Sequence, residues 1–317
     1  MNKIPVVAVV GPTASGKTAL AVSLAKKLNA EVISFDSMQI YKNMHIASAA
    51  PDLEELCGIP HHLIEFVEPD TKFSVADFVK KARTVADEIA LRKKNIIIVG
   101  GTGLYINSFI DNIIFEDEAP SEELRKRLNA EFDEYGGEEM LKRLKVFDKE
   151  SAERLHPNNK KRIIRAFEIY LSSGITMTTQ IENSQNTASP YIPYMLGLNY
   201  SDRSVLYEKI NIRVDEMVKK GLLEEAKHTY MSQNGGTSVQ AIGHKEFFPY
   251  FDGEVTLEEA VEQLKASTRR YAKRQLTWFM RDERINWIYR DVSPDVVDAA
   301  FNILERNGYF EQTAQNY

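Results

Sequence analysis

Residues 11–18 of the chain read GPTASGKT, a glycine-rich stretch that ends in a lysine and a threonine. They match the pattern G-x-x-x-x-G-K-[ST] at every defined position, between an apolar run, Ile4–Val10, and a helical pattern, Ala19–Asn29. Glycines let successive N–H groups point inward, and the following helix N-terminus favours an anion. The lysine adds a positive charge, and the threonine hydroxyl suits Mg²⁺. The sequence therefore predicts a site for a di- or triphosphate.

A carboxylate follows the second apolar run, Glu31–Phe35. In open α/β sheets, ligands bind outside the carboxyl ends of the strands, so we expect Asp36 to lie close to the phosphate loop. There it can ligate Mg²⁺ or act as a general base, and the alternative is a side chain that only caps the next helix. Its place beside the phosphate site favours a functional role.

The third apolar run, Asn95–Val99, ends in Gly100–Gly103 and not in an acid. Enzymes that hydrolyse nucleotides usually hold Mg²⁺ with an acid there, so a hydrolytic motor is not expected. The glycines let a ligand approach the backbone, and Thr102 supplies a hydroxyl. A glycine turn needed only for packing is the alternative.

These segments must be positioned by a sheet. Short apolar runs are separated by long helical stretches and fall at Ile4–Val10, Glu31–Phe35, Asn95–Val99, Tyr194–Asn199 and Asn286–Tyr289. Such alternation predicts an α/β fold, a parallel sheet with helices on both faces.

A helical insert separates the third and fourth runs. Apolar residues recur at spacings of three and four across residues 121–171, with breaks at Gly136-Gly137 and at Pro157. We expect an all-helical domain of residues 116–185 inserted into a core domain, residues 1–115 and 186–317. The loops 111–120 and 178–193 would be its hinges. Both a movable lid and a rigid elaboration remain open.

Composition limits the class of protein. Of 317 residues, 43% are hydrophobic and 27% are charged, which is ordinary for a globular protein. Cys57 is the only cysteine, which excludes an internal disulfide and fits a reducing compartment. The N-terminal apolar run is too short for a membrane span and lacks a signal pattern. We expect a cytoplasmic monomer with no membrane partner. The adjacent His61 and His62 would face opposite ways in an extended segment, which argues against one shared metal.

The net charge of −6 argues weakly against a nucleic-acid partner, but the cations are clustered. Within residues 265–281 they repeat every four positions in two rows: Lys265, Arg269 and Lys273, and Arg270 and Arg274. A helix would carry them as a stripe. Such stripes are usually just solvated, yet their density in an acidic chain favours contacts with a phosphate backbone.

Together these segments resemble the tRNA dimethylallyltransferase family, also called tRNA isopentenyltransferases. The matching segments follow the family order from residue 11 to residue 279: GPTASGKT, DSMQIYKNM, GIPHHLIEFVEP, GGTGLY, KRIIRAFEIY, RVDEMVKKGLLEEA, QAIGHKE and YAKRQLTWF. The resemblance implies a P-loop core like that of nucleotide kinases and an insert that helps to clamp the tRNA anticodon stem-loop. No counterpart of the eukaryotic zinc-finger extension is present, so we expect a bacterial-type member.

The resemblance also implies the reaction and its partners. A dimethylallyl group would pass from dimethylallyl diphosphate to the exocyclic amine of the adenosine just 3′ of the anticodon in tRNA, with Mg²⁺ as the cofactor. That amine is a poor nucleophile because its lone pair is delocalised, so it must lose a proton while the leaving diphosphate is stabilised. Asp36 can take the proton, and Lys17, Arg213 and the loop amides can stabilise the diphosphate. The adenosine must also leave its stack to reach the site.

Residue roles carry over where the motifs match. The catalytic candidates are Asp36 as general base, Thr102 and Lys17. The diphosphate would be held by Gly11, Thr13, Ala14, Ser15, Gly16, Lys17, Thr18 and Arg213, with Thr18 also a ligand of Mg²⁺. The tRNA contacts would come from Asp36, Ser37, Met38, Gln39, Thr102, Arg125, Lys160, Lys161, Arg162, Ile163, Ile164, Gln240, Gly243 and Lys245, and from Arg270 and Arg274 of the basic stripe.

The chain departs from the family pattern in three places. Residues 45–50 read HIASAA where Asp-Ile-Gly-Thr-Ala-Lys is common, His244 stands where tyrosine is common, and Met280 where arginine is frequent. Contacts from residues 45–50 are therefore open to doubt. Two alternatives also remain on the residues alone: an ATP-dependent small-molecule kinase, which would use the same loop and sheet, and an RNA-binding module without catalysis.

Overall fold

The computed structural model divides the chain into two compact units. It describes residues 3–115, 121–232, 239 and 241–314. The first unit is formed by Met1–Ile110 with Pro190–Tyr317, and the second is Asp111–Ser189. The residues 116–185 expected as an insert fall within the second unit.

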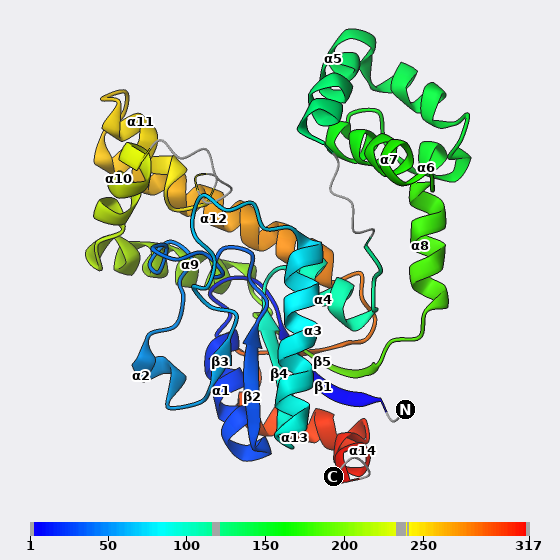
Figure 1. The fold of residues 1–317 in the computed structure, drawn as a ribbon. Coiled ribbons are helices and arrows are strands. Elements are labelled where there is room, and N and C mark those ends of the chain that lie inside the picture. Colours follow the sequence, from blue (N-terminus) through cyan, green and yellow to red (C-terminus); the bar gives the residue numbers. More distant parts are fainter. Residues whose placement is uncertain (1–2, 116–120, 233–238, 240, 315–317) are drawn as a thin grey trace. The chain divides into compact units, whose positions relative to one another are not determined.

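A six-stranded sheet forms the centre of the first unit (Figure 1). The strand order is β3-β2-β4-β1-β5-β6, and every pairing is parallel. The strands are β1 Ile4–Val10, β2 Ala30–Ser34, β3 His61–His62, β4 Asn95–Gly100, β5 Tyr191–Asn199 and β6 Ile285–Tyr289. The predicted α/β class with a parallel sheet is confirmed.

Two strands differ from the sequence prediction. His61–His62 form a short edge strand paired with Val32 and Ile33, and two residues are too few to give a periodic signal. Strand β5 begins at Tyr191 and runs through Pro193, which the sequence analysis placed in a loop. Proline is tolerated there because β6 pairs with β5 only from Met195 onward, which leaves one edge of β5 unpaired at Pro193.

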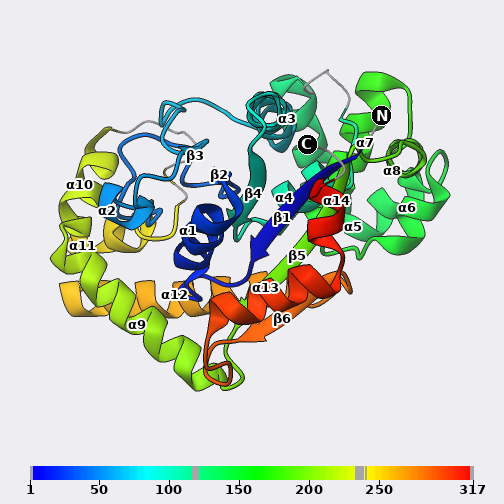
Figure 2. The same ribbon diagram turned by 90° about the horizontal axis from the view of Figure 1, so that it is seen from below.

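Helices cover both faces of the sheet (Figure 2). On one face, α1 Lys17–Leu28, α13 Val296–Arg306 and α14 Tyr309–Ala314 contribute to a core with inward-facing strand residues. On the other, α3 Val75–Leu91 and α4 Gly103–Ile110 supply aromatic rings. Phe35, at the end of β2, packs edge-on against Phe78 and Phe109 at centroid distances of 4.9 and 5.2 Å.

Further helices of this unit stand beyond the carboxyl ends of the strands (Figure 1): α9 Arg203–Lys219, α10 Leu222–Ser232, the 3₁₀ turn η2 Lys245–Phe247, α11 Phe248–Phe251 and α12 Leu257–Phe279. The short helix α2 Leu53–Leu56 packs beside α1. Helix α12 begins with a capping box between Thr256 and Glu259 and packs against α9, α4 and η2. Among the described residues, no helix is long and apolar enough to cross a membrane.

The second unit consists of helices, as predicted: α5 Glu122–Leu144, α6 Lys149–Arg154, α7 Lys160–Ser173 and α8 Met177–Asn186. The predicted break at Gly136 is present, with φ 75° and ψ 165°. The prediction of a hinge loop at 178–193 is wrong over α8. That helix is capped by Thr176, whose side chain accepts from the Thr179 amide, and its polar sequence concealed the helical pattern.

Candidate active site

The phosphate loop adopts the curled backbone that its glycines predicted. Gly16 ends the loop as the N-cap of α1 with φ 82°, and Ala14 also has positive φ, 62°. Arg290, which directly follows β6, supports the turn, because its Nη1 donates to the Ser15 carbonyl at 3.0 Å. The Ser15 hydroxyl oxygen is buried and has no partner among the described residues. A bound anion would satisfy such a group.

Gln275 of α12 ties this loop to the second glycine turn. Its Oε1 accepts from the Thr13 amide at 2.8 Å, and its Nε2 donates to the Gly101 carbonyl at 3.0 Å. A Cβ on Gly101 would lie 2.0 Å from that Nε2, so the glycine makes the close approach possible. The sequence analysis gave Gln275 no role, although the residue falls in the quoted segment YAKRQLTWF.

Two basic side chains, Lys17 and Arg213, are buried at the loop. Burial and the nearby Arg213 charge, opposed by Asp36, together lower the pKa of Lys17 from 10.5 to about 7. Burial also lowers the pKa of Arg213, which comes from α9 and donates to the Thr13 hydroxyl at 3.4 Å. Each of these desolvated positive charges raises the free-energy cost of keeping the other one charged, and an anion bound between them would offset that cost. This is the electrostatic signature of a phosphate site.

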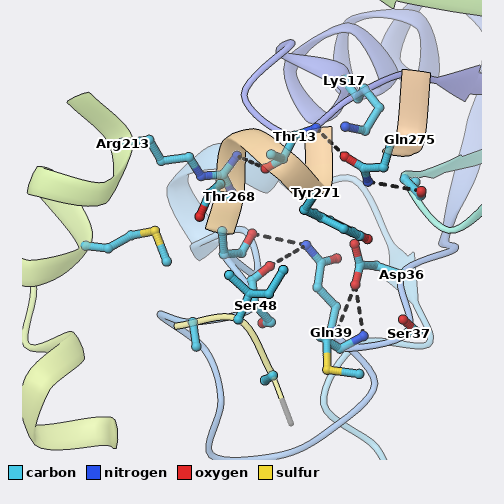
Figure 3. Close-up of a pocket in the computed structure, with 18 of the residues that line it drawn as sticks. Thr13, Lys17, Asp36, Ser37, Gln39, Ser48, Arg213, Thr268, Tyr271 and Gln275 are labelled. Atoms are coloured by element: carbon cyan, nitrogen blue, oxygen red, sulfur yellow. Dashed lines mark hydrogen bonds between the residues drawn. The ribbon is translucent and has the colours of Figure 1, made fainter. Parts of the chain in front are cut away.

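Asp36 lies on the same cavity, whose volume is about 340 Å³ (Figure 3). Its Oδ1 accepts from the Met38 amide at 2.9 Å and from the Gln39 amide at 3.4 Å. The alternative that Asp36 only caps a helix is wrong, because residues 37–40 form a turn and the next helix, α2, has Asp52 as its N-cap. The carboxylate is held in place by the backbone that follows it and shares the cavity lining with Lys17 and Thr18.

Thr102 positions its neighbours. Its Oγ1 accepts from the Ser37 amide at 3.0 Å, which connects the second glycine turn to the segment after β2. Tyr271 of α12 lies between these parts: burial raises the pKa of its phenol, the Asp36 charge adds to the rise, and hydrogen bonds with Thr102 and Gln275 oppose it. The sequence analysis noted Tyr271 only as an aromatic among cations and missed its place facing Asp36.

The residues predicted to contact tRNA from the first unit largely gather here. Met38, Gln39, Lys245 and Arg274 line the same cavity as Asp36 and Ser37. Gly243 has φ +113° and allows its segment to pass close to Ala47, 3.1 Å from the position of a Cβ. Gln240 lies outside the described residues.

The basic stripe of α12 divides into two rows with different surroundings. Lys265 pairs with Asp215 at 2.9 Å and Arg269 donates to Asn211 at 2.6 Å, so this row is engaged with α9. Arg270 and Arg274, with Lys245, line a second cavity of about 450 Å³, and Arg274 and Lys245 also line the first. Of the five cations of the stripe, Arg274 alone lines the cavity of Asp36, and Arg270 lines the second cavity beside it.

In the second unit, predicted tRNA contacts differ in exposure. Lys161 and Arg162 are exposed in the first turn of α7. Lys160 pairs with Asp133 at 2.5 Å. Arg125 forms a two-point pair with Glu168, at 2.6 and 3.1 Å, and thereby balances a buried carboxylate.

The prediction that Ile163 and Ile164 contact tRNA is wrong for their side chains. They are 0% and 5% exposed and belong to the apolar core of the second unit, with Leu128 and Met140. They lie on the inner side of α7, whereas Lys161 and Arg162 lie on its outer side. The quoted segment therefore mixes an apolar face with a basic one.

A divalent cation fits the residues present. Thr18, which carries a hydroxyl, lines the Asp36 cavity and also a further cavity, of about 830 Å³, with Lys209 and Arg290. Among the described residues, no group of three or more His, Cys, Asp or Glu could hold a metal. Mg²⁺ commonly binds through one or two protein oxygens, with phosphates and waters completing its octahedron. The single hydroxyl and nearby carboxylate suit that pattern.

Comparison with known proteins decides the family. The model of the family described as IPP transferase matches residues 39–282. A tRNA dimethylallyltransferase of Caldanaerobacter subterraneus subsp. tengcongensis is 47% identical over 305 residues, 95% of this chain and 97% of the relative. The chain belongs to the IPP transferase family. A tRNA dimethylallyltransferase of Bacillus subtilis is also 47% identical, over 93% of each chain.

Solved structures of IPP transferases agree. The full-length tRNA isopentenylpyrophosphate transferase from Bacillus halodurans is 43% identical over 99% of this chain and 98% of its own, with a TM-score of 0.72. A eukaryotic dimethylallyltransferase acting on tRNA is 29% identical over 97% of this chain and 80% of its own, with a TM-score of 0.82. The predicted resemblance is confirmed, and with it an enzyme of the tRNA dimethylallyltransferase class. None of these relatives supports the kinase alternative.

Proposed function

We propose that this chain transfers the dimethylallyl group of dimethylallyl diphosphate to the exocyclic amine of the adenosine 3′ of the tRNA anticodon, giving isopentenyladenosine and diphosphate. The observation that carries the proposal is one cavity in which two desolvated basic side chains, Lys17 and Arg213, share the lining with the carboxylate of Asp36. Cations suit the leaving group, and the carboxylate suits the proton of the acceptor.

On the leaving-group side, the chain's own residues stabilise developing negative charge. As the bond between the allylic carbon and the diphosphate oxygen breaks, charge grows on that oxygen. Lys17, Arg213 and the amides of the phosphate loop are already in place to receive it, so little reorganisation is needed. The orphaned Ser15 hydroxyl offers one more donor. Mg²⁺ held at Thr18 would supply further positive charge to the phosphate oxygens when bound.

On the acceptor side, Asp36 takes a proton. The adenine amine forms its bond to carbon while one of its N–H protons passes to a carboxylate oxygen. The amides of Met38 and Gln39 bind Oδ1 and fix the direction of the carboxylate, which leaves Oδ2 for the amine. The Tyr271 ring, beside Asp36, offers a surface on which an extruded base can stack.

The RNA backbone needs a basic surface beside this cavity. Lys245, Arg270 and Arg274 supply one in the first unit, and Lys161 and Arg162 are exposed in the second. Both sets suit phosphate contacts, which support clamping of the anticodon stem-loop by the insert. A tRNA substrate also favours a cytoplasmic location, and we expect a monomer.

Mass spectrometry of nucleosides tests the proposal. Unmodified tRNA with adenosine at this position is incubated with the protein, Mg²⁺ and dimethylallyl diphosphate, then digested. The expected result is the gain of one five-carbon prenyl unit on that adenosine, and a tRNA with guanosine at the same position is the control. No gain, together with ATP-dependent phosphorylation of a small acceptor, would overturn the proposal.

A further inference from the structure

Residues 45–50, here called the wall loop, separate two cavities. Ala47, Ser48 and Ala49 line the cavity that contains Asp36, while His45, Ile46, Ala49 and Ala50 line the cavity on the other side of Lys17. The loop is a tight turn in which the Ser48 amide donates to the Met44 carbonyl and the Ala50 amide to the His45 carbonyl, both at 3.0 Å. The position of the wall loop therefore sets the width of the cavity that contains Asp36, here called the acceptor cavity.

On its cavity side, the wall loop is attached through Gln39 to residues 36–39, the segment that contains Asp36 (Figure 3). The side-chain Nε2 of Gln39 donates to the carbonyls of Ser48 and Ala49, at 3.3 and 3.0 Å. Its Oε1 accepts from the Ser34 hydroxyl at 2.8 Å, and its backbone amide donates to Asp36. A shift of the wall loop would be passed to Gln39 and then to Asp36.

On its outer side, the wall loop is held by one carboxylate. Glu225 of α10 accepts from the Ile46 amide through Oε2 and from the Ala47 amide through Oε1, each at 2.9 Å. These are the amides that a tight turn leaves without internal partners. Bonds from two amides to one carboxylate are charge-assisted and fix the turn in two places.

A buried histidine orients this carboxylate. His244 is 0% exposed, and its Nε2 donates to Oε1 of Glu225 at 2.9 Å. Its Nδ1 is buried and has no partner among the described residues, so the Glu225 bond is its one polar anchor there. Burial acts to raise the pKa of Glu225, but the bonds from His244, Ile46 and Ala47 lower it overall and keep the carboxylate ionised.

We propose that Glu225, oriented by His244, is a positioning residue for the acceptor: it fixes the wall loop, and thereby the width of the adenosine cavity and the placement of Gln39 beside Asp36. Glu225 itself lines neither cavity. The expected effect on the KM for tRNA rests on the proposed function, whereas the expected effect on amide exchange does not. No chemistry is assigned to the pair. Its effect falls on the tRNA side of the reaction because the wall loop is bonded to Gln39, which binds Asp36, whereas Lys17 and Arg213 donate to Pro12 and Thr13.

Hydrogen exchange and kinetics together test this role. In Glu225→Gln an NH₂ replaces one acceptor oxygen, so the exchange of the Ile46 and Ala47 amides should accelerate about tenfold or more while the α1 and α3 amides keep their rates. The KM for tRNA should rise about tenfold, since a charge-assisted bond is lost, with the affinity for inorganic diphosphate unchanged. Glu224→Gln, an exposed neighbour on α10, is the matched control and should change neither.

The outcomes separate the two proposals. Unchanged amide exchange in Glu225→Gln, or a KM for tRNA equal to that of the wild type, would overturn the positioning role. A wild-type protein that modifies no tRNA would overturn the proposed function and leave the exchange measurement still informative. If Glu225→Gln does not fold, Glu225→Asp, which keeps the charge but reaches only one amide, should show the same changes at smaller size.

A double-variant cycle tests the part of His244. His244→Phe keeps a ring but removes the donor to Glu225. Because the histidine acts through the glutamate, its effect on the KM for tRNA should largely vanish in the Glu225→Gln background. Additive effects of the two changes would mean that His244 acts on the wall loop independently, and would remove it from the proposal.

Discussion

The phosphate loop and the acceptor side of the cavity contact the same space but are built differently. The loop is one contiguous segment, residues 11–18, with its curvature set by Gly11, Gly16 and the start of α1. The acceptor side is assembled from residues 36–39, the wall loop and α12, which are far apart in the sequence. A local motif is sufficient to specify an anion site, whereas placing an acceptor base requires the whole tertiary structure.

The two sides also differ in whether their charged and polar groups already have partners within the described residues. At the loop, Lys17 and Arg213 are desolvated beside each other, and the Ser15 hydroxyl is left without a partner among the described residues. On the acceptor side, Asp36, Gln39 and Glu225 are already hydrogen-bonded within the chain. The loop is thus prepared for a charged ligand that completes it, and the acceptor side is a preformed surface.

The largest expected effect is on the acceptor side. Asp36→Asn keeps an oxygen to accept from the Met38 and Gln39 amides but cannot take a proton. We expect kcat to fall by about 10²- to 10⁴-fold, the usual range for a general base, with diphosphate and tRNA affinity retained. Rapid-quench single turnover measures the chemical step. Near-normal turnover would remove Asp36 as the base.

On the loop side, Lys17→Met removes a charge that stabilises the leaving group. We expect kcat to fall by about 10²- to 10³-fold, as for the loss of one preorganised donor, together with weaker binding of inorganic diphosphate. Titration calorimetry measures that binding. Affinity for tRNA should not change, because Lys17 faces the other substrate. A selective loss of tRNA binding would contradict the division into two sides.

A smaller effect concerns the open row of the basic stripe. Arg270→Ala with Arg274→Ala should raise the KM for tRNA severalfold and reduce the slope of log affinity against log salt by about 1.4, the value for two phosphate contacts to single-stranded RNA. Lys265→Ala is the control, since Lys265 is already paired with Asp215 and Glu262. An equal change in slope for both variants would mean that the two rows do not differ.

The smallest effect concerns stability. Folding lowers the pKa of Lys17 from its ordinary value of 10.5 to about 7. Between pH 7 and pH 10.5 the unfolded chain therefore binds more protons than the folded one. The free energy of unfolding must then rise with pH across that window from this group. Urea unfolding at pH 7 and pH 9 should show a larger rise for the wild type than for Lys17→Met. Equal rises would show that Lys17 is not desolvated.

What the sequence predicted follows the same division. The phosphate loop, its flanking β1 and α1, and the parallel sheet could be predicted because their signals are local: glycine spacing and runs of apolar residues. Gln275 and Tyr271 could not, since their roles depend on α12 lying across the ends of β1 and β4. Patterns of short or polar segments also failed, as β3 and α8 show.

The same reasoning explains why the sequence did not separate exposed from engaged residues on the basic helices α12 and α7. Periodicity placed all the α12 cations on a helix but could not show that α9 engages Lys265 and Arg269. In the second unit, the segment KRIIRAFEIY was taken whole, although a helix turns successive residues to different sides and buries Ile163. Only the packed structure separates these faces.

The most direct test of the account is the stoichiometry of diphosphate release. The central claim is that the cradle holds a leaving diphosphate and not a phosphate in transfer. With dimethylallyl diphosphate and tRNA as the only substrates, a coupled assay should find one intact inorganic diphosphate for each prenylated adenosine, with no need for ATP. Release of orthophosphate in step with turnover, or an absolute requirement for ATP, would contradict it.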